Sequence, residues 1–334
     1  MITKVELRRL GRYVMLAAYL AVLAFWSASA WANSVWLSDG VSARMIEVSE
    51  TGRIVSDFVL QSDIGPLAPE VIIRGNHGGF WVNAGDQRLS DHFYHVAPTG
   101  QLLGAYRVPD HNAKITSIAI AHDGDVWVAA KRWTEMYPIF GEVRGDSNAI
   151  SVYAPDGTLI HTMPMGHSKP LQIVNGTGRL MWIAATDGIY QATRNGQLRK
   201  LVSTSHPTIA ASPDGDLWSI VDGSNLVEYN ESGAKITEFH SRHLQHMKNL
   251  YVTANAIWAA SLDQVYKFNQ QGRLLALDEL PIGQEAGMAQ GTNGTIWLEG
   301  WLSPKTSWIM VLDHSGSVIS QKNLQGVYAL AISE

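Results

Sequence analysis

The residues best suited to chemistry in this chain are histidines that lie in segments without a strand pattern. One carboxylate, Glu285, lies in a segment of the same kind. Together the candidate residues are His111, His167, His206, His243, His246 and Glu285. Neutral imidazole and carboxylate groups bind zinc, copper and similar divalent ions, and both groups can transfer protons. The chain has no H-E-x-x-H phrase and no tight group of three histidines. A metal site therefore requires the fold to bring distant segments together.

Four of these residues are the predicted metal ligands, namely His167, His206, His243 and Glu285. If their segments meet at one mouth of a channel, they would hold a divalent ion and leave positions open for substrate or water. The alternative is that the histidines are ordinary surface residues of loops, a few of which cap strand ends. Histidine alone is a weak signal for a metal, so both interpretations stay open at this point.

A second group of residues has the composition of a binding surface. Residues 131–148 form the longest irregular segment and contain aromatic side chains and arginines, and another aromatic residue falls in the shorter segment 299–307. Tryptophan, tyrosine and arginine commonly anchor protein and ligand interfaces. The alternative is that Trp133 and Phe140 fold back as a local cover. The predicted ligand-binding residues are Trp133, Tyr137, Phe140, Arg144, His111 and Trp301.

A repeated phrase indicates the elements that must position these residues. A polar residue and a glycine precede an apolar run with tryptophan near its start, as in His122-Asp123-Gly124-Asp125-Val126-Trp127. The tryptophans recur every 36 to 55 residues, at Trp36, Trp81, Trp127, Trp182, Trp218, Trp258 and Trp297. Buried aromatic side chains dominate the cores of such repeats, so we expect most of these tryptophans to pack between repeats. A period near 40 residues is typical of four-stranded propeller blades.

A second phrase follows each tryptophan and predicts a hairpin. An apolar residue stands four positions before a glycine, and in six of the seven copies another apolar residue stands two positions after it. Apolar residues at a spacing of two bury one face of a strand, and glycine supplies the positive φ of a tight turn. The turn glycines are Gly52, Gly100, Gly157, Gly196, Gly233, Gly272 and Gly316.

These repeats predict an all-β fold, a seven-bladed β-propeller of four-stranded blades. We name the strands of a blade a to d from the axis outward, and in the third blade we expect them at residues 115–121, 125–130, 149–154 and 158–163. The first repeat lacks strand a, and residues 326–333 read as a strand a without a blade. The C-terminal strand is therefore expected to complete the first blade and close the ring, which hides exposed sheet edges.

In such a ring, the a–b and c–d turns lie on one face, and the b–c and d–a loops lie on the other. The turns are short and uniform in this sequence, whereas the loops are irregular and hold most of the histidines and loop aromatics. Functional residues concentrate on variable loops of a rigid scaffold. We therefore expect the turn face to be structural and the loop face to be functional.

Composition limits the classes of partner. The chain has 334 residues, a net charge of −5 and no cysteine. Removing residues 1–32, which carry four basic groups and one acidic group, would make the charge −8. An acidic body argues against nucleic acid as a partner, and the lack of cysteine excludes disulfides and thiolate metal sites.

Residues 1–32 resemble a secretory signal peptide. A basic start, an apolar run of 13 residues and the small residues around Ala30 and Ala32 fit cleavage before Asn33. A run this short does not comfortably cross a hydrocarbon core that needs about 20 residues, although an uncleaved anchor remains the alternative. Residues 33–334 would then form the mature propeller domain in the periplasm or outside the cell, without stable membrane insertion.

The repeat signature resembles streptogramin lyase (virginiamycin B lyase) and related NHL-type propellers. The Asp-Gly-x-apolar-Trp turns and the phrase Gly166-His167-Ser168-Lys169-Pro170 carry this resemblance, which spans residues 33–334. It implies a magnesium-dependent ring-opening elimination by carboxylates and a histidine on one propeller face. In that family an acid often stands three residues after tryptophan. The positions here are Asp39, Ala84, Ala130, Ala185, Val221, Ser261 and Gly300, and only Asp39 is acidic.

Two functions are consistent with these observations. The missing acids favour an exported scaffold of the cell envelope that binds a small molecule or an envelope protein through its loop face. The grouped histidines favour a metal-dependent lyase or hydrolase of the streptogramin-lyase type, with its site at the channel mouth.

Overall fold

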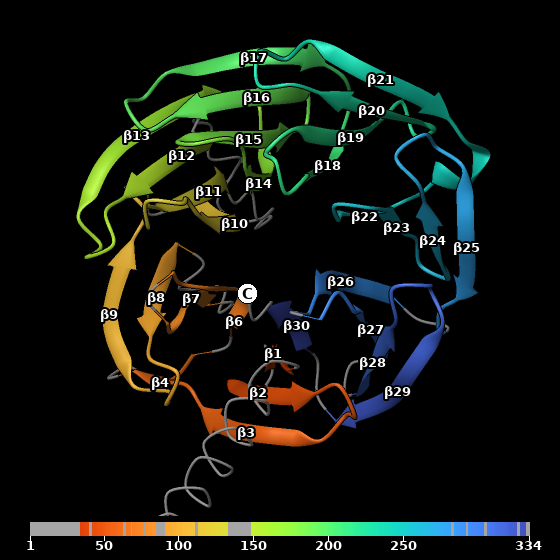
Figure 1. Ribbon diagram of the computed structural model, residues 1–334. Coiled ribbons are helices and arrows are strands. Elements are labelled where there is room, and N and C mark those ends of the chain that lie inside the picture. Colours follow the sequence, from red (N-terminus) through yellow and green to blue (C-terminus); the bar gives the residue numbers. More distant parts are fainter. Residues whose placement is uncertain are drawn as a thin grey trace, which may run out of the picture.

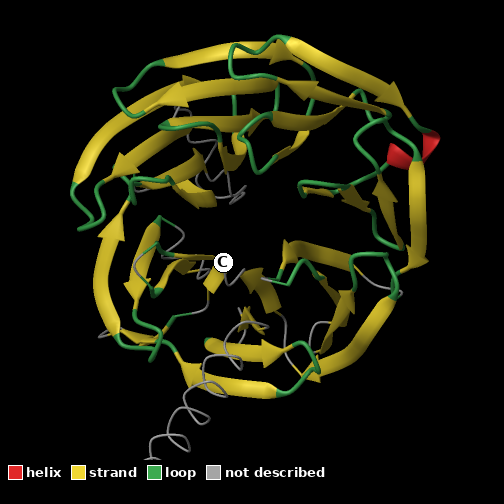
Figure 2. Cartoon of the chain, in the orientation of Figure 1, coloured by secondary structure: helices red, strands yellow, loops and turns green. Residues whose placement is uncertain are grey.

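The fold is a ring of β-sheets around a central axis (Figure 1). The structure is a computed structural model. It describes residues 34–331 apart from 40–41, 63–64, 68, 77, 85–90, 111–112, 133–147, 282–283, 292, 304–305 and 326–327. Seven four-stranded antiparallel sheets form the blades, which confirms the predicted seven-bladed β-propeller. Strands make up nearly all the regular structure, and a short 3-10 helix, η1 (Arg242–Leu244), is coloured red in Figure 2.

The first three blades contain the N-terminal strands and the last strand of the chain. From the axis outward, their strands are β30 (Tyr328–Ala331), β1 (Ser34–Asp39), β2 (Arg44–Ser49) and β3 (Ile54–Val59); β6 (Pro69–Arg74), β7 (Phe80–Ala84), β8 (His92–Val96) and β9 (Leu102–Arg107); β10 (Ala113–Ile120), β11 (Val126–Arg132), β12 (Asn148–Tyr153) and β13 (Leu159–Gly166). A small hairpin, β4 (Gln61–Ser62) and β5 (Gly65–Pro66), joins the first two blades. The third blade matches the four expected strands to within three residues at each end.

The remaining four blades follow the chain in order. Their strands are β14 (Pro170–Asn175), β15 (Leu180–Ala185), β16 (Gly188–Thr193) and β17 (Leu198–Ser203); β18 (Thr208–Ala211), β19 (Leu217–Val221), β20 (Asn225–Tyr229) and β21 (Lys235–His240); β22 (Asn249–Val252), β23 (Ile257–Ala260), β24 (Gln264–Phe268) and β25 (Leu274–Glu279); β26 (Gln284–Gln290), β27 (Ile296–Ser303), β28 (Thr306–Leu312) and β29 (Val318–Gln325). No helix in the described part of the chain is long and apolar enough to span a membrane.

The ring closes as the sequence predicted. β30 pairs antiparallel with β1, from Trp36 opposite Ala331 to Asp39 opposite Tyr328. The two ends of the propeller therefore share one sheet, and Figure 1 shows β30 at the axis beside β1. Pairing within one blade removes the free edge that an open array would leave at each end.

The core consists of apolar layers between neighbouring blades rather than a single central cluster. Each layer joins side chains of two adjacent blades, and the layer between the last and first blades contains Val35, Leu37, Trp297 and Ile309. The seven repeat tryptophans are each 6% exposed or less. They lie in these layers, which confirms the expectation that they are packing residues.

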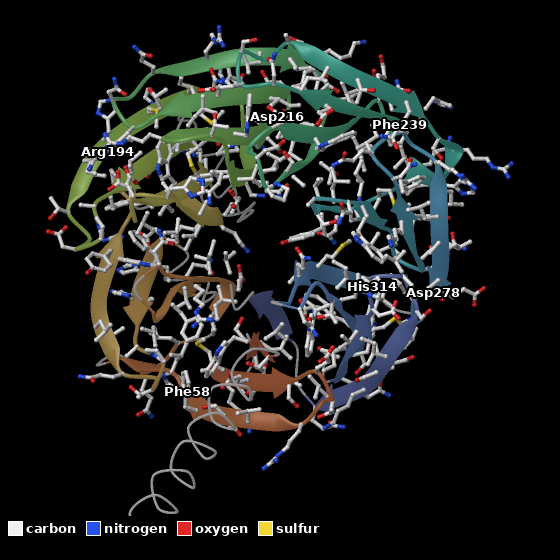
Figure 3. The ribbon with its side chains drawn as sticks, in the orientation of Figure 1. Phe58, Arg194, Asp216, Phe239, Asp278 and His314 are labelled. Atoms are coloured by element: carbon white, nitrogen blue, oxygen red, sulfur yellow. The ribbon has the colours of Figure 1, made fainter. Side chains whose placement is uncertain are left out.

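The c–d turns connect neighbouring blades at the rim. All seven turn glycines have φ between +76° and +103°, as the hairpin phrase required. Each glycine also lies beneath a side chain from strand d of the preceding blade. Phe58 covers Gly100 and Phe239 covers Gly272, and Figure 3 labels both phenylalanines near the rim of the ring. Glycine is required here both for the left-handed conformation and for the close approach of the neighbouring blade.

We predict that Gly157→Ala destabilises the protein more than Gly178→Ala does. Both glycines have positive φ, which costs alanine about 1–2 kcal/mol. A Cβ at Gly157 would lie 1.7 Å from Tyr106 Cε1, whereas a Cβ at Gly178 would meet nothing within 4 Å. Displacing Tyr106 would also break its 3.1 Å hydrogen bond to the Asp156 carbonyl, which adds about 1 kcal/mol. Urea unfolding of the two variants measures this difference, and equal losses would contradict a packing role at the rim.

Candidate functional site

Most of the predicted ligand-binding residues lie outside the described residues. These are Trp133, Tyr137, Phe140 and Arg144 of the long loop, together with His111. The exception is Trp301, which lies near the end of β27 opposite Gln284 of β26 and Ser307 of β28. Its side chain is 40% exposed on the loop face, next to Leu302 at 39%.

The predicted metal ligands come from four different blade connections. His167 is exposed in the turn after β13, and His206 lies between β17 and β18 with φ +49°, its Nδ1 2.9 Å from Ser205 Oγ. His243 belongs to η1, and its ring centroid lies 5.0 Å from that of Tyr266. Glu285 pairs with Gly300 within the seventh blade, and its side chain is not among those that the structure describes.

The described histidines and carboxylates form no group that could hold a metal ion. Within the described ranges, no three His, Asp or Glu side chains are close enough together for such a site. His167, His206 and His243 are all included in that statement, so the three do not meet at one point. A site that also involves Glu285 stays a prediction, and the described geometry adds nothing in its favour.

A cavity lies instead at the opposite end of the channel, on the turn face. Its volume is about 650 Å³, and six of the seven blades contribute to its wall through their a strands and a–b turns. The apolar part of the lining includes Ile72, Ile120, Val252 and Met288. The polar part includes Arg74, Asn76, His122, Asp214, Tyr251 and Gln290. The wall therefore mixes polar and apolar side chains, and it is more polar than a typical site for a small molecule.

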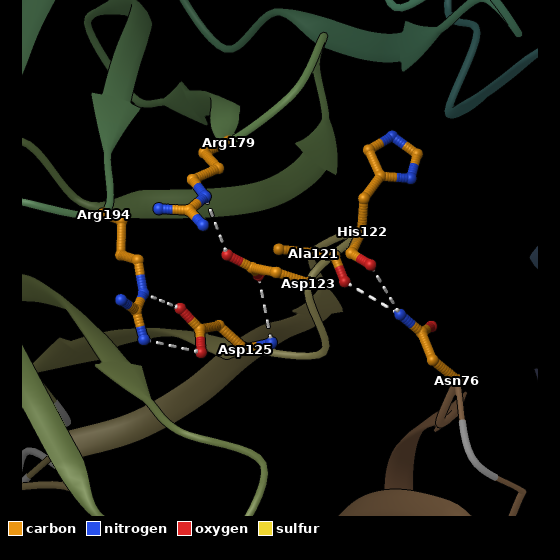
Figure 4. Close-up of polar contacts among 7 residues, drawn as sticks. All are labelled: Asn76, Ala121, His122, Asp123, Asp125, Arg179 and Arg194. Atoms are coloured by element: carbon orange, nitrogen blue, oxygen red, sulfur yellow. Dashed lines mark hydrogen bonds and ion pairs between the residues drawn. The ribbon is translucent and has the colours of Figure 1, made fainter.

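Hydrogen bonds between blades hold the turn that carries His122 (Figure 4). Asn76 Nδ2 donates to the carbonyls of Ala121 and His122 at 3.0 and 3.4 Å. From the other side, Arg194 forms an ion pair with the buried Asp125 carboxylate. This contact raises the pKa of the Arg194 guanidinium, since its charged form is stabilised by the Asp125 carboxylate. The turn is therefore fixed between the second and fourth blades.

Two polar atoms near this cavity have no hydrogen-bond partner among the described residues. They are Asn175 Oδ1 and Thr177 Oγ1, both on the fourth blade and both inaccessible in the present arrangement. Buried polar atoms are normally satisfied, so a water molecule or a small rearrangement is expected here. The lining can thus donate and accept hydrogen bonds. It includes the imidazole of His122 and the carboxylate of Asp214.

The turn face was expected to be structural, and this stays a prediction. The turns are short, but they converge on the axis and enclose a cavity between their polar residues. The sequence signal was present, because His122, Asn76 and Asp214 all occupy a–b turns. The short length of these turns did not indicate that they enclose a cavity.

Comparison with known proteins supports the fold and leaves the activity open. No family model matches the chain, and no curated protein matches it in sequence. Virginiamycin B lyase from Staphylococcus aureus has a similar structure, with a TM-score of 0.62, 18% identity and coverage of 80% of this chain and 88% of the lyase. A catalytically inactive variant of that lyase with quinupristin gives a TM-score of 0.61 at 16% identity, covering 88% and 92% of the two chains.

A dehydrogenase is also among the structures with a similar fold. The dihydro-heme d1 dehydrogenase NirN, in complex with DHE, gives a TM-score of 0.58 at 9% identity, covering 90% of this chain and 74% of NirN. Identities this low establish the fold alone. The chain is a seven-bladed β-propeller scaffold that is similar in fold to streptogramin lyase.

Proposed function

We propose that this protein is an exported binding scaffold of the cell envelope that takes a protein partner or a small molecule on its loop face. The closed ring supports this proposal, because it fixes the strand ends from which the loops extend. Export is inferred from the basic and apolar pattern of residues 1–32, which is typical of a cleaved secretory signal.

The exposure of Trp301 carries the binding proposal. Repeat tryptophans such as Trp182 and Trp297 are 1% exposed or less, yet Trp301 is 40% exposed beside the exposed Leu302. Large apolar side chains exposed together, as these are at the end of β27, are typical of interaction sites. Tryptophan is also among the residues that contribute most to binding when a partner covers it.

Site-specific photo-crosslinking in the producing cells tests this proposal. A photoreactive residue replaces Trp301 in the full chain, and a matched variant carries it at Leu275, which is 49% exposed on the outer strand β25. We expect a discrete crosslinked product from position 301 only, in the envelope fraction. The recovered chain is expected to begin at or near Asn33. Equal products at the two positions, or none at 301, would contradict the binding role of Trp301, and a membrane-bound chain beginning at Met1 would contradict export.

The alternative function is a metal-dependent lyase or hydrolase, and similarity to virginiamycin B lyase is the observation in its favour. Of the seven positions where that family often has an acid, only Asp39 is acidic, and it is 3% exposed and accepts a hydrogen bond from Ser42. Metal analysis of the purified chain, before and after chelation, separates the two functions. One divalent ion per chain, removed by the chelator, would favour the enzyme.

A further inference from the structure

We propose that the seam between the third and fourth blades is an anion-binding site that recognises a phosphate or carboxylate group of a small molecule. Lys131 of the third blade and Lys169, just before the inner strand of the fourth blade, form it, and Lys114 of the third blade lies beside Lys131. The site is independent of the Trp301 surface, because its residues belong to other blades.

Two of these lysines are direct neighbours across the sheet. Lys114 of β10 is paired with Lys131 of β11. Side chains directly opposite each other in an antiparallel pair have Cβ atoms about 4.5–5.5 Å apart, and two like charges in this position destabilise the sheet. Lys131 lies on the same face of β11 as Trp127 and Ala129, because alternate residues of a strand point to the same side. Trp127 and Ala129 pack against the fourth blade. The side chain of Lys131 therefore points toward the seam between the third and fourth blades.

The third lysine is supplied by the fourth blade and is held firmly. Lys169 directly precedes β14, the inner strand of that blade. Its N–H donates to Thr186 Oγ1 at 3.2 Å, and its carbonyl accepts from the Thr186 N–H at 3.0 Å. The next residue, Pro170, accepts a 3.0 Å hydrogen bond from Thr116 of β10, which ties the two blades together at this point. These hydrogen bonds fix the backbone of Lys169 beside the third blade.

The positive charge of this group is only partly neutralised. Lys114 forms a 2.9 Å ion pair with Glu70 of β6, in the second blade, so its charge is already balanced. No carboxylate in the described part of the chain forms an ion pair with Lys131 or Lys169. Burial lowers the pKa of Lys131, and the charges of Lys114 and Lys169 lower it further. The repulsion that Lys131 experiences from its neighbours costs stability, and an anion bound by Lys131 and Lys169 would offset it.

The chemistry of the site favours a compact anionic group. Lysine acts as a flexible point charge with three donors, and it binds phosphate and carboxylate oxygens through short charge-assisted hydrogen bonds. Half-burial of Lys131 strengthens such contacts because water screens them less. One anionic group that reaches Lys131 and Lys169 together would relieve their mutual repulsion.

Calorimetric titration of the purified chain with inorganic pyrophosphate and with citrate, at constant ionic strength, tests the site. We expect Lys131→Gln and Lys169→Gln each to weaken binding by about tenfold or more, since each removes a hydrogen bond to a charged group. The matched control is Lys235→Gln, which makes the same charge change on the fifth blade, where Lys235 pairs with Glu238. The ligand-free Lys131→Gln variant is also expected to melt at a higher temperature than the wild type.

Each outcome decides the proposal. Tighter binding of pyrophosphate identifies a phosphate-bearing ligand, and tighter binding of citrate identifies a carboxylate-bearing one. The absence of binding to the wild type, or an equal loss in the Lys235→Gln control, would overturn the site. Lys131→Arg keeps the charge and should retain binding. A loss of about tenfold or more in Lys131→Arg would therefore also overturn the assignment, and this test does not require Lys131→Gln to fold.

Discussion

Deleting residues 326–334 is expected to abolish cooperative folding of the propeller. The deletion removes β30, which supplies the innermost strand of the first blade. It would leave β1 without its partner from Trp36 to Asp39, although all six residues of β1 are buried. Each buried backbone group that loses its partner costs about 1–3 kcal/mol, against a typical total stability of about 5–15 kcal/mol. β30 also packs against β6 and β26, so both neighbouring blades lose contacts.

A permuted chain provides the control for this deletion. Residues 326–334 are moved ahead of Ser34 through a short turn, so that strand a enters the first blade as it does in the other blades. We expect the truncated chain to aggregate through its exposed edge and the permuted chain to regain a single cooperative melting transition. A truncated chain that melts like the intact protein would show that pairing between β30 and β1 does not close the ring.

The sequence was sufficient to predict the architecture because its signals are local and repeated. A tryptophan marked strand b of every blade, after a polar-glycine turn in the clearest copies, and the turn glycines marked each c–d hairpin. Closure followed from a strand missing at one end and a surplus strand at the other. These features depend on alternation and turn conformation over a few residues, which the local sequence specifies directly.

The site was harder to predict, because it depends on distances across the ring. His167, His206 and His243 come from successive blade connections, as expected. The sequence does not specify how close each connection lies to the axis, and the three side chains do not form a metal site. The opposition of Lys114 and Lys131 depends on strand register, which is shifted by a bulge between Ile115 and Ser117. Bulges and side-chain directions are set by contacts between blades, which the repeat phrases do not encode.

Replacing Trp182 with alanine is expected to destabilise the propeller far more than replacing a tryptophan at its surface. Trp182 is fully buried in the layer between the fourth and fifth blades, among Ile189, Ile209 and Leu217. Removing a buried tryptophan side chain costs about 3–5 kcal/mol, because the lost contacts and the remaining cavity add. The loss is measured by urea unfolding. Trp301→Ala should cost much less, because Trp301 is already 40% exposed to solvent.

Substitution by phenylalanine separates packing from hydrogen bonding at the same tryptophan. Trp182 Nε1 donates to the Gly215 carbonyl at 3.1 Å, whereas Trp127 Nε1 finds no acceptor among the described residues. Trp182→Phe leaves that carbonyl without its donor, whereas Trp127→Phe removes a buried N–H that was already unpaired. We therefore expect Trp182→Phe to cost about 1 kcal/mol more than Trp127→Phe, because an unpaired buried group carries its full desolvation penalty. If the two phenylalanine variants lose equal stability, the indole contact to Gly215 contributes nothing and the tryptophans act between blades through their volume alone.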